Sequence, residues 1–192
     1  MTDTAHSPLG PSSAERWLEC PGSVNATRGI KDTSSEYAAE GSFAHLIAEK
    51  ARKLNKPAKA FIGHKGSHDG FDFECDKEMA QHVQYFIDYV NQWECDENLN
   101  EMKVSFDSWV DGGFGTLDAA LMNDGTTIIC DLKYGKGIQV FAKDNPQLKL
   151  YALGLFQEYG DMYEIETFKM CIVQPRLDWI DEWEISLDEL LV

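Results

Sequence analysis

The chain of 192 residues is 43% hydrophobic and 11% aromatic, enough for one packed domain over residues 1–192 that buries roughly 70% of its unfolded surface without disulfides or a structural metal. It has no apolar run long enough to cross a membrane and no secretory leader, which favours a cytoplasmic protein. The formal net charge of −16, from 17 basic and 33 acidic residues, speaks against a nucleic-acid partner, because phosphate normally recruits a basic surface.

The first part of the chain predicts two helices. Residues 1–11 are expected to form a flexible arm. Ser12–Glu15 matches a capping box that opens a short helix, and Cys20–Gly22 contains the proline and glycine that end it. A second helix is predicted from about Ser35 to Leu54, followed by Asn55 and then a proline.

A loop and a third helix follow. Residues 60–75 are rich in glycine and predict a loop with at most a short strand, in which His64 and His68 are exposed. Asp76 is a good N-cap for the next helix. The apolar residues of that helix recur at helical spacing and should face the core; they are Met79, Val83, Phe86, Ile87, Val90 and Trp93.

The second half has the character of a sheet with one helix. Strands are predicted at Met102–Val110, Thr116–Met122, Thr126–Tyr134, Glu164–Gln174 and Trp179–Ile185, and a helix from Asn145 to Gly160. A second capping box at Ser186–Glu189 stands a turn before the last residue, so either the domain ends abruptly or the chain is a piece of a longer protein. The element order predicts an α/β sandwich around a mixed sheet.

A tight hairpin in this region sets two acids opposite each other. With Asp124 and Gly125 as a two-residue loop, the strand register places Asp118 opposite Asp131. Opposed residues hold their Cβ atoms about 5 Å apart, and two like charges at that distance are destabilising. A divalent cation such as Mg²⁺ would hold them together, because it takes oxygen ligands from one or two carboxylates.

Lys133 follows Asp131 by two residues, so both side chains leave the strand on the same face. An ammonium beside a metal stabilises negative charge that develops on a phosphodiester. The two charges interrupt an apolar strand, where unpaired charges cost several kcal/mol. The alternative is an edge strand with an incidental ion pair between the two residues.

These residues resemble a known family. Gly115–Asp118, followed by Asp131–Lys133, is similar to the core motif of the PD-(D/E)xK nuclease superfamily, although the proline of the first motif is missing. Three further segments resemble its RecB and lambda-exonuclease branch, especially phage-encoded members: Glu40–His45 matches G-x-x-x-H, Asn145–Tyr151 matches Q-x-x-x-Y, and Ser12–Pro21 matches the opening. The resemblance spans residues 12–176, and it implies a restriction-endonuclease-like core with a central mixed β-sheet flanked by helices.

The resemblance also implies roles at the site. His45, Asp118, Asp131 and the backbone carbonyl of Leu132 would hold one or two Mg²⁺ (or Mn²⁺) ions, and Lys133 would assist catalysis. The roles of the remaining residues are less specific. Gln147 and Tyr151 lie four residues apart on one helix face and would contact substrate phosphate or a catalytic water, although a tyrosine there also suits the core.

Five other residues are weaker candidates. Lys136, in a Gly-Lys-Gly segment after the catalytic strand, and Arg176 are placed to reach DNA phosphate. Trp17 and Glu40 are candidates as members of the matched segments. Glu101 is expected to precede the first strand of the meander, where some members of the superfamily carry an acid and where a solvated strand end is equally compatible.

The resulting hypothesis is a metal-dependent DNA nuclease, by resemblance an exonuclease of phage or bacterial recombination and repair. It would act on DNA, with a single-strand annealing protein as a partner and with oligomerisation open. The four lysines between residues 131 and 150 supply a local basic floor despite the overall charge. A nuclease-derived binding module is the alternative, and an acidic DNA mimic is a third. The five cysteines are scattered without a C-x-x-C pair, so a zinc ribbon and disulfides are not expected.

Overall fold

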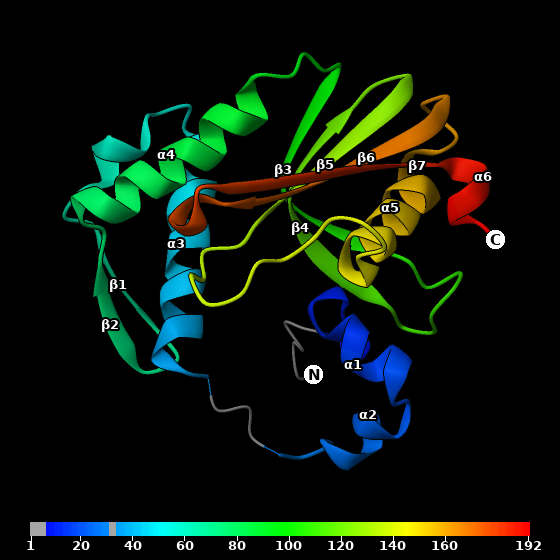
Figure 1. Cartoon of the computed structure of the whole chain (residues 1–192), viewed down its shortest axis with the longest axis horizontal. Coiled ribbons are helices and arrows are strands. Elements are labelled where there is room, and N and C mark those ends of the chain that lie inside the picture. The colour runs from blue at the N-terminus through cyan, green and yellow to red at the C-terminus, as the bar shows by residue number, and fades with distance from the viewer. Residues whose placement is uncertain (1–6, 31–33) are drawn as a thin grey trace.

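The computed structural model describes residues 7–30 and 34–192 (Figure 1). In chain order, with 3₁₀ helices written η, the elements are η1 (Pro11–Ser13), α1 (Ala14–Glu19), α2 (Gly22–Ala26), α3 (Glu36–Lys53), η2 (Ala58–Phe61), β1 (Lys65–His68), β2 (Phe71–Glu74), α4 (Lys77–Asn91), β3 (Glu97–Ser105), β4 (Phe114–Met122), β5 (Gly125–Leu132), α5 (Pro146–Tyr159), β6 (Ile165–Gln174), η3 (Pro175–Leu177), β7 (Trp179–Ser186) and α6 (Leu187–Leu190). None of these helices is long and apolar enough to span a lipid bilayer.

A five-stranded mixed sheet separates two helical layers (Figure 1). Its order is β3-β4-β5-β6-β7; β5 and β6 are parallel, with α5 in the connection between them, and the other neighbours are antiparallel. Helices α3 and α4 pack on one face, against Ala119 and Cys130, and α5 packs on the other, against Ala120 and Ile129. Successive strand residues thus face opposite layers. The predicted mixed sheet flanked by helices is confirmed.

The helices that carry and support the site begin at their predicted starts, and Asp76 and Asn145 are the predicted caps. The Ser35 side chain accepts a hydrogen bond from the Ala38 amide at the start of α3. Asp76 does the same for Met79 in α4, over 2.7 Å, and Asn145 caps α5. Each cap satisfies amides that would otherwise lack a partner in the first turn. Five of the six residues of the predicted core face lie on α4 and are buried; Trp93 lies beyond the helix, which ends at Asn91, and is half-buried.

The N-terminal segment differs from its prediction. Of the predicted arm, residues 1–6 lie outside the described residues, and residues 7–11 are packed: the Ser7 hydroxyl donates to the Gly112 carbonyl over 3.0 Å, and Pro11 is buried. The predicted capping box of Ser12 and Glu15 does not form, because Ser12 lies inside η1 and α1 begins at Ala14, which makes Ser13 the N-cap, without a side-chain cap bond. Pro21 ends the first helix but also starts a second, α2, since proline suits a first helical turn.

The loop predicted over residues 60–75 is instead a hairpin, β1–β2. Its two-residue turn, Asp69–Gly70, has φ angles of 50° and 86°, the left-handed pair that tight hairpins require. His64 and His68 were expected to be exposed, but both are half-buried. The His64 Nε2 atom lies 2.8 Å from the Lys50 ammonium, and the ring of Phe43 lies beside both histidines. The hairpin is therefore docked on α3.

Strand β3 begins at Glu97, five residues before the predicted start, and ends at Ser105 rather than Val110. The difference arises because pairing with β4 extends to Met122 and supplies hydrogen bonds to a polar stretch that has little strand character of its own. The shift places Glu101 in the middle of β3, the edge strand of the sheet, rather than ahead of it.

Candidate metal centre and active site

Two acidic side chains meet on the β4–β5 hairpin. The ladder pairs Ala119 with Cys130, and the same register sets Asp118 opposite Asp131, as the turn at Asp124–Gly125 predicts. The predicted register is confirmed. Both carboxylates line one cavity of about 530 Å³. The hairpin thus brings the two acids to a common space, and Asp131 is only 3% exposed there.

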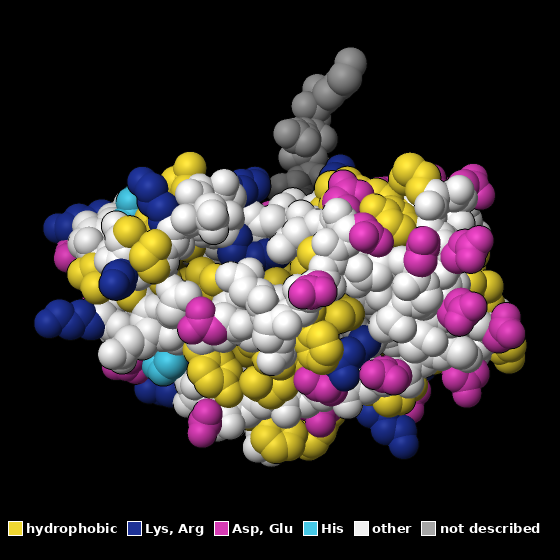
Figure 2. Space-filling model, turned by 90° about the horizontal axis from the view of Figure 1, so that it is seen from above, with side chains coloured by type: hydrophobic (Ala, Val, Ile, Leu, Met, Phe, Trp, Pro, Cys, Tyr) yellow, Lys and Arg dark blue, Asp and Glu magenta, His cyan; other side chains and the backbone are white. Residues whose placement is uncertain are grey.

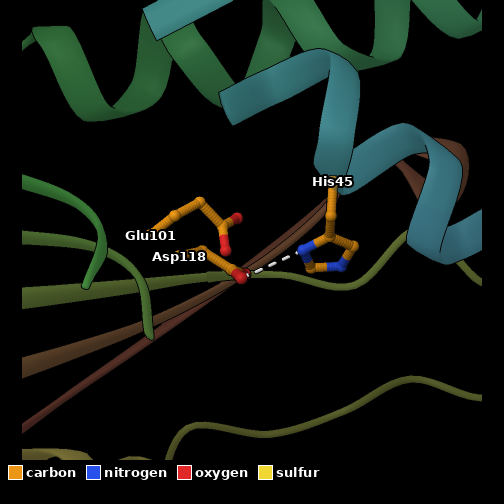
Figure 3. Close-up of side chains that lie close together, drawn as sticks. All are labelled: His45, Glu101 and Asp118. Carbon is orange, nitrogen blue, oxygen red and sulfur yellow. Dashed lines mark hydrogen bonds and ion pairs between the residues drawn. The ribbon is translucent and has the colours of Figure 1, made fainter. Parts of the chain in front are cut away.

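Asp118 is held from two sides (Figure 3). Its Oδ1 atom lies 3.0 Å from Nδ1 of His45, which projects from α3, and its Oδ2 atom accepts a hydrogen bond of 2.7 Å from the Leu132 amide. Helix α3 approaches the sheet closely because alanines such as Ala44 and Ala48 form its packed face. His45 therefore reaches the sheet while the alanines beside it remain buried.

Glu101 adds a third carboxylate from the neighbouring strand (Figure 3). The β3–β4 ladder is paired on both sides of Glu101 and Asp118 but not at these two residues, which lie opposite each other. Glu101 has a φ angle of 50°, a left-handed conformation that is unfavourable for a residue with a side chain. Ligand atoms of His45, Glu101 and Asp118 all lie within 4.8 Å of one another. Strained backbone of this kind is common at functional sites.

Asp131 is embedded in a polar network with Lys133 and α5. The Lys133 ammonium donates to Gln147 Oε1 over 2.7 Å and lies 2.8 Å from Asp131 Oδ2. The Gln147 amide donates to Asp131 Oδ1 over 3.0 Å and contacts the Tyr151 hydroxyl, which donates to the Thr116 carbonyl. Asp131 Oδ2 is buried, and the Lys133 ammonium pairs with it at 2.8 Å.

Negative charge dominates the cavity. Its ionisable lining consists of His45, His68, Asp69, Glu101, Asp118, Asp131, Lys133 and Tyr151. Four carboxyl groups therefore face one ammonium. Carboxylate oxygens and an imidazole nitrogen are the ligands that Mg²⁺, Mn²⁺ and related divalent ions take from proteins. The arrangement suits a divalent cation.

A family model described as "Protein of unknown function (DUF2800)" matches residues 6–192. The chain belongs to this family. Two solved structures are similar to this DUF2800 chain. One, described as a candidate exonuclease from Eubacterium rectale, is 12% identical, with a TM-score of 0.46, and the match covers 100% of the DUF2800 chain and 79% of the other. The second, SSO0001, is 16% identical with a TM-score of 0.37, over 92% of the DUF2800 chain and 62% of the other.

The electrostatics of the DUF2800 site favour protons on two of the three clustered groups. Burial lowers the pKa of His45, but the negative charge of Asp118 and the hydrogen bond to it outweigh burial and raise the pKa to about 9. Burial raises the pKa of Glu101 to about 8, with the charge of Asp118 adding to the effect. Both groups hold a proton at neutral pH when no metal is bound.

The two hairpin acids are shifted in opposite directions. Burial opposes ionisation of Asp118, yet His45, the Leu132 amide and Lys133 together lower its pKa. Burial raises the pKa of Asp131, and the charge of Asp118 contributes, while Lys133 offsets part of the shift. Carboxyl groups with perturbed pKa values in a cavity are typical of functional sites, so these shifts mark the cavity as a candidate site.

We expect Mn²⁺ binding to release protons from this DUF2800 site. A metal requires neutral His45 and ionised Glu101, whereas their raised pKa values keep both protonated at pH 7, so protons compete with the ion below about pH 8. Between pH 6.5 and 8 the dissociation constant should fall by about tenfold per pH unit for each displaced proton. Titration calorimetry in two buffers of different ionisation enthalpy measures the number released. A dissociation constant that is independent of pH over this window would contradict the prediction.

The structure does not bring Trp17 and Lys136 to the cavity. Trp17 is 7% exposed, and its indole nitrogen donates to the Gly10 carbonyl over 3.1 Å. It packs in a small cluster with Phe106 and Leu150, because the first helix lies against α5 rather than at the surface. Lys136 is exposed in the loop after β5 and does not line the cavity.

Arg176 and Glu40 lie apart from the cavity and contact each other. The guanidinium of Arg176 donates to a Glu40 carboxylate oxygen over 2.7 Å and covers the ring of Tyr134. The side chain of Arg176 is 11% exposed, so the pair is largely enclosed between α3 and η3. Because the guanidinium already pairs with a carboxylate at close range, its charge is largely neutralised and it would attract a phosphate only weakly.

Sequence reasoning missed His68 and Asp69, which both line the cavity. They stand at the turn of the β1–β2 hairpin, which packs on α3. The signal for this hairpin was present, since Asp-Gly between short apolar-polar alternations is typical of a tight turn. That the hairpin reaches the site depends on its docking, for which the sequence has no marker.

Proposed function

We propose that this chain is a divalent-metal-dependent nuclease of the PD-(D/E)xK type, which hydrolyses phosphodiester bonds of DNA. The observation that supports it most strongly is the row of three acids on adjacent strands, Glu101, Asp118 and Asp131, which share one cavity with His45 and Lys133. Acids from neighbouring strands, an imidazole and a lysine are the groups that metal-assisted hydrolysis of a phosphodiester needs.

The residues present fit a divalent ion. His45, Asp118 and Asp131 would hold it, as the resemblance implies, together with the Leu132 carbonyl; the geometry adds Glu101, which clusters with His45 and Asp118. The Asp131 Oδ2 atom is buried and pairs with the Lys133 ammonium at 2.8 Å, and a carboxylate oxygen with one such partner keeps a second lone pair for a ligand. We favour Mg²⁺ or Mn²⁺, because hard oxygen donors dominate the set.

The protein groups have separate tasks in this proposal. A bound divalent ion would lower the pKa of a coordinated water and offset negative charge on the phosphate. Lys133, held by Gln147 and Asp131, presents its ammonium to the cavity and stabilises charge on a phosphate oxygen. Gln147 and Tyr151 keep Asp131 and Lys133 in place through hydrogen bonds anchored on the Thr116 carbonyl.

The acidity of the molecule is compatible with a DNA substrate when its distribution is considered. Figure 2 shows Asp and Glu side chains gathered towards one end of the molecule, the end where α6 lies in Figure 1. Of the four lysines between residues 131 and 150, Lys133 lines the cavity. With a divalent ion in the cavity the local charge seen by a phosphate becomes less negative, and its approach becomes favourable.

We infer an exonuclease that acts in phage or bacterial recombination or repair, in the cytoplasm, with a single-strand annealing protein as the kind of partner that such an enzyme serves. An oligomer would be compatible with processive digestion. Measurement of the solution mass, together with the product sizes formed from long linear DNA, tests both points.

A digestion assay tests the activity itself. Purified protein is incubated with linear duplex, closed circular duplex and single-stranded DNA, each with Mg²⁺, Mn²⁺ or EDTA. We expect digestion of linear DNA with either metal, none in EDTA, and little on closed circles, because an exonuclease needs an end. Digestion of closed circles at the same rate would replace the exonuclease by an endonuclease, and no digestion of any substrate would refute the nuclease.

The Lys133→Met variant should digest linear DNA about 100- to 1000-fold more slowly than the wild type, because an electrostatic group aimed at developing charge is worth about that much. Methionine retains the unbranched shape of the side chain. Lys136→Met is the matched control, since Lys136 is exposed outside the cavity and should lose little. Equal losses in both variants would mean that Lys133 acts only through general charge.

The net charge of −16 favours one competing function, a nuclease-derived binding module that acts with a protein partner. In that case the site would bind metal and the protein would show no digestion. Calorimetry with Mn²⁺ alongside the digestion assay separates the two functions. The enzyme should both bind Mn²⁺ and digest DNA, whereas the binding module should only bind Mn²⁺.

A further inference from the structure

Arg52 occupies the interruption in the β3–β4 ladder behind the acids. Its Nη1 atom donates to the Asp118 backbone carbonyl over 2.8 Å and to Asn100 Oδ1 over 2.7 Å. Its Nη2 atom donates to Asn98 Oδ1 over 2.6 Å and to the Leu99 carbonyl at 3.4 Å. One guanidinium thus donates hydrogen bonds to both β3 and β4, next to the point where Glu101 faces Asp118.

The interruption is more than a missing hydrogen bond. Leu117 and Ala120 pack in the cluster on the α5 face, whereas Ala119 packs in the cluster on the α3 face. A regular strand would place positions 117 and 119 on the same face. The alternation therefore breaks at Asp118, and the left-handed φ angle of Glu101 marks the same break on β3. A backbone distorted on two strands needs an external donor to satisfy its carbonyls.

Helix α3 contacts Asp118 at two places. His45 lies against the Asp118 carboxylate, and Arg52, seven residues later on the same helix, bonds its backbone carbonyl. Residues seven apart share a helix face, two turns from each other. The helix therefore fixes both the side chain and the backbone of Asp118. The helical turns between the two contacts are packed, since Ile47, Ala48 and Ala51 are buried.

Arg52 does not face the cavity that contains the acids. It lines a different cavity, of about 570 Å³, whose walls come from α3, α4 and β3 and include Asn98 and Asn100. A substrate or ion in the site would therefore not touch it. Its planar fork of five donors matches four acceptors from two strands, which the three donors of a lysine on a single nitrogen do not reproduce.

We propose that Arg52 is a positioning residue, which holds Asp118 and Glu101 side by side so that they bind one divalent ion. The inference rests on the proposed function for the identity of the ligand, but its subject is the metal-free geometry of the two acids. Groups that orient metal ligands without touching the metal typically contribute about 10- to 100-fold to metal affinity.

The test is the affinity of the purified full chain for Mn²⁺, measured by titration calorimetry. We expect Arg52→Lys and Arg52→Gln to raise the dissociation constant about 10- to 100-fold. Asn98→Ala removes one of the four acceptors and should raise it only about 2- to 10-fold, the worth of one hydrogen bond. Lys56→Gln is the control, because Lys56 lines the same cavity but is exposed and should leave the affinity unchanged.

Stability must be measured separately, because the loss of Arg52 leaves carbonyl and amide oxygens without a donor. Circular dichroism in EDTA identifies the variants that are folded at the titration temperature. If Arg52→Gln is unfolded there, Arg52→Lys and Asn98→Ala decide. A folded Arg52→Lys that binds Mn²⁺ as tightly as the wild type overturns the inference, and so does a loss of affinity in Lys56→Gln equal to that in Arg52→Lys.

The result is distinguishable from failure of the proposed function. Wild-type protein that binds Mn²⁺ with the expected dependence on Arg52, yet digests no DNA, refutes the nuclease and supports the positioning role. If the wild type digests DNA but Arg52→Lys retains full metal affinity, the result supports the nuclease and refutes the positioning role. Wild-type protein that binds no Mn²⁺ overturns both.

Discussion

Asp131→Asn is expected to reduce the rate of metal-dependent DNA digestion by about 1000-fold while leaving the protein at least as stable as the wild type in EDTA. Loss of one carboxylate from a divalent site removes several kcal/mol of transition-state stabilisation, and about 4 kcal/mol corresponds to three powers of ten in rate. The raised pKa of Asp131, caused by burial and by Asp118, means that its ionised form opposes folding at neutral pH. A neutral amide of the same shape relieves that cost.

The sign of the stability effect follows from linkage. A carboxyl group whose pKa is higher in the folded state destabilises the fold at pH values above its unfolded pKa, and this cost is absent at lower pH. The melting temperature of Asp131→Asn in EDTA should therefore equal or exceed that of the wild type at pH 7 and approach it at pH 4. Asp144→Asn is the control, since Asp144 is exposed and lies outside the cavity. Full activity in Asp131→Asn would remove Asp131 from the site, and a clearly lower melting temperature would assign it a structural role.

Phe43→Ala is expected to destabilise the protein by about 3 to 5 kcal/mol, the usual cost of removing a fully buried phenylalanine. Phe43 is 0% exposed, and its ring lies 5.8 Å from that of Phe73 and 6.3 Å from that of His68. Gly66 on β1 is so close that a Cβ atom there would stand 2.8 Å from the Phe43 ring. The side chain therefore joins the hairpin to α3.

Because His68 lines the site, this substitution should also loosen one wall of the cavity. Urea unfolding measures the loss of stability, and hydrogen exchange of the β1–β2 amides should show faster exchange than in the sheet. Tyr37→Ala is the matched control on the same helix, where the side chain is 79% exposed and should cost less than about 0.5 kcal/mol. Unchanged exchange in the hairpin would show that it is held by contacts other than Phe43.

Several features were predictable because they depend on residues close together in the sequence. Ser35, Asp76 and Asn145 cap helices through bonds to amides two or three residues ahead, so the boundaries of α3, α4 and α5 follow from local chemistry. The hairpin turn sets the β4–β5 register in the same way. One local pattern was misleading: the expected capping box of Ser12 and Glu15 failed because Ser12 lies inside η1 and α1 begins two residues later.

The sequence by itself determined that Asp118 and Asp131 oppose each other, because a two-residue turn leaves only one register for the strands that it joins. Only the tertiary structure decided what surrounds them. Glu101 meets Asp118 through pairing between strands, and Arg52 reaches the same backbone from a helix 66 residues earlier. Arg176 pairs with Glu40 across 136 residues. Such contacts depend on how whole layers pack, and no pattern of neighbouring residues encodes them.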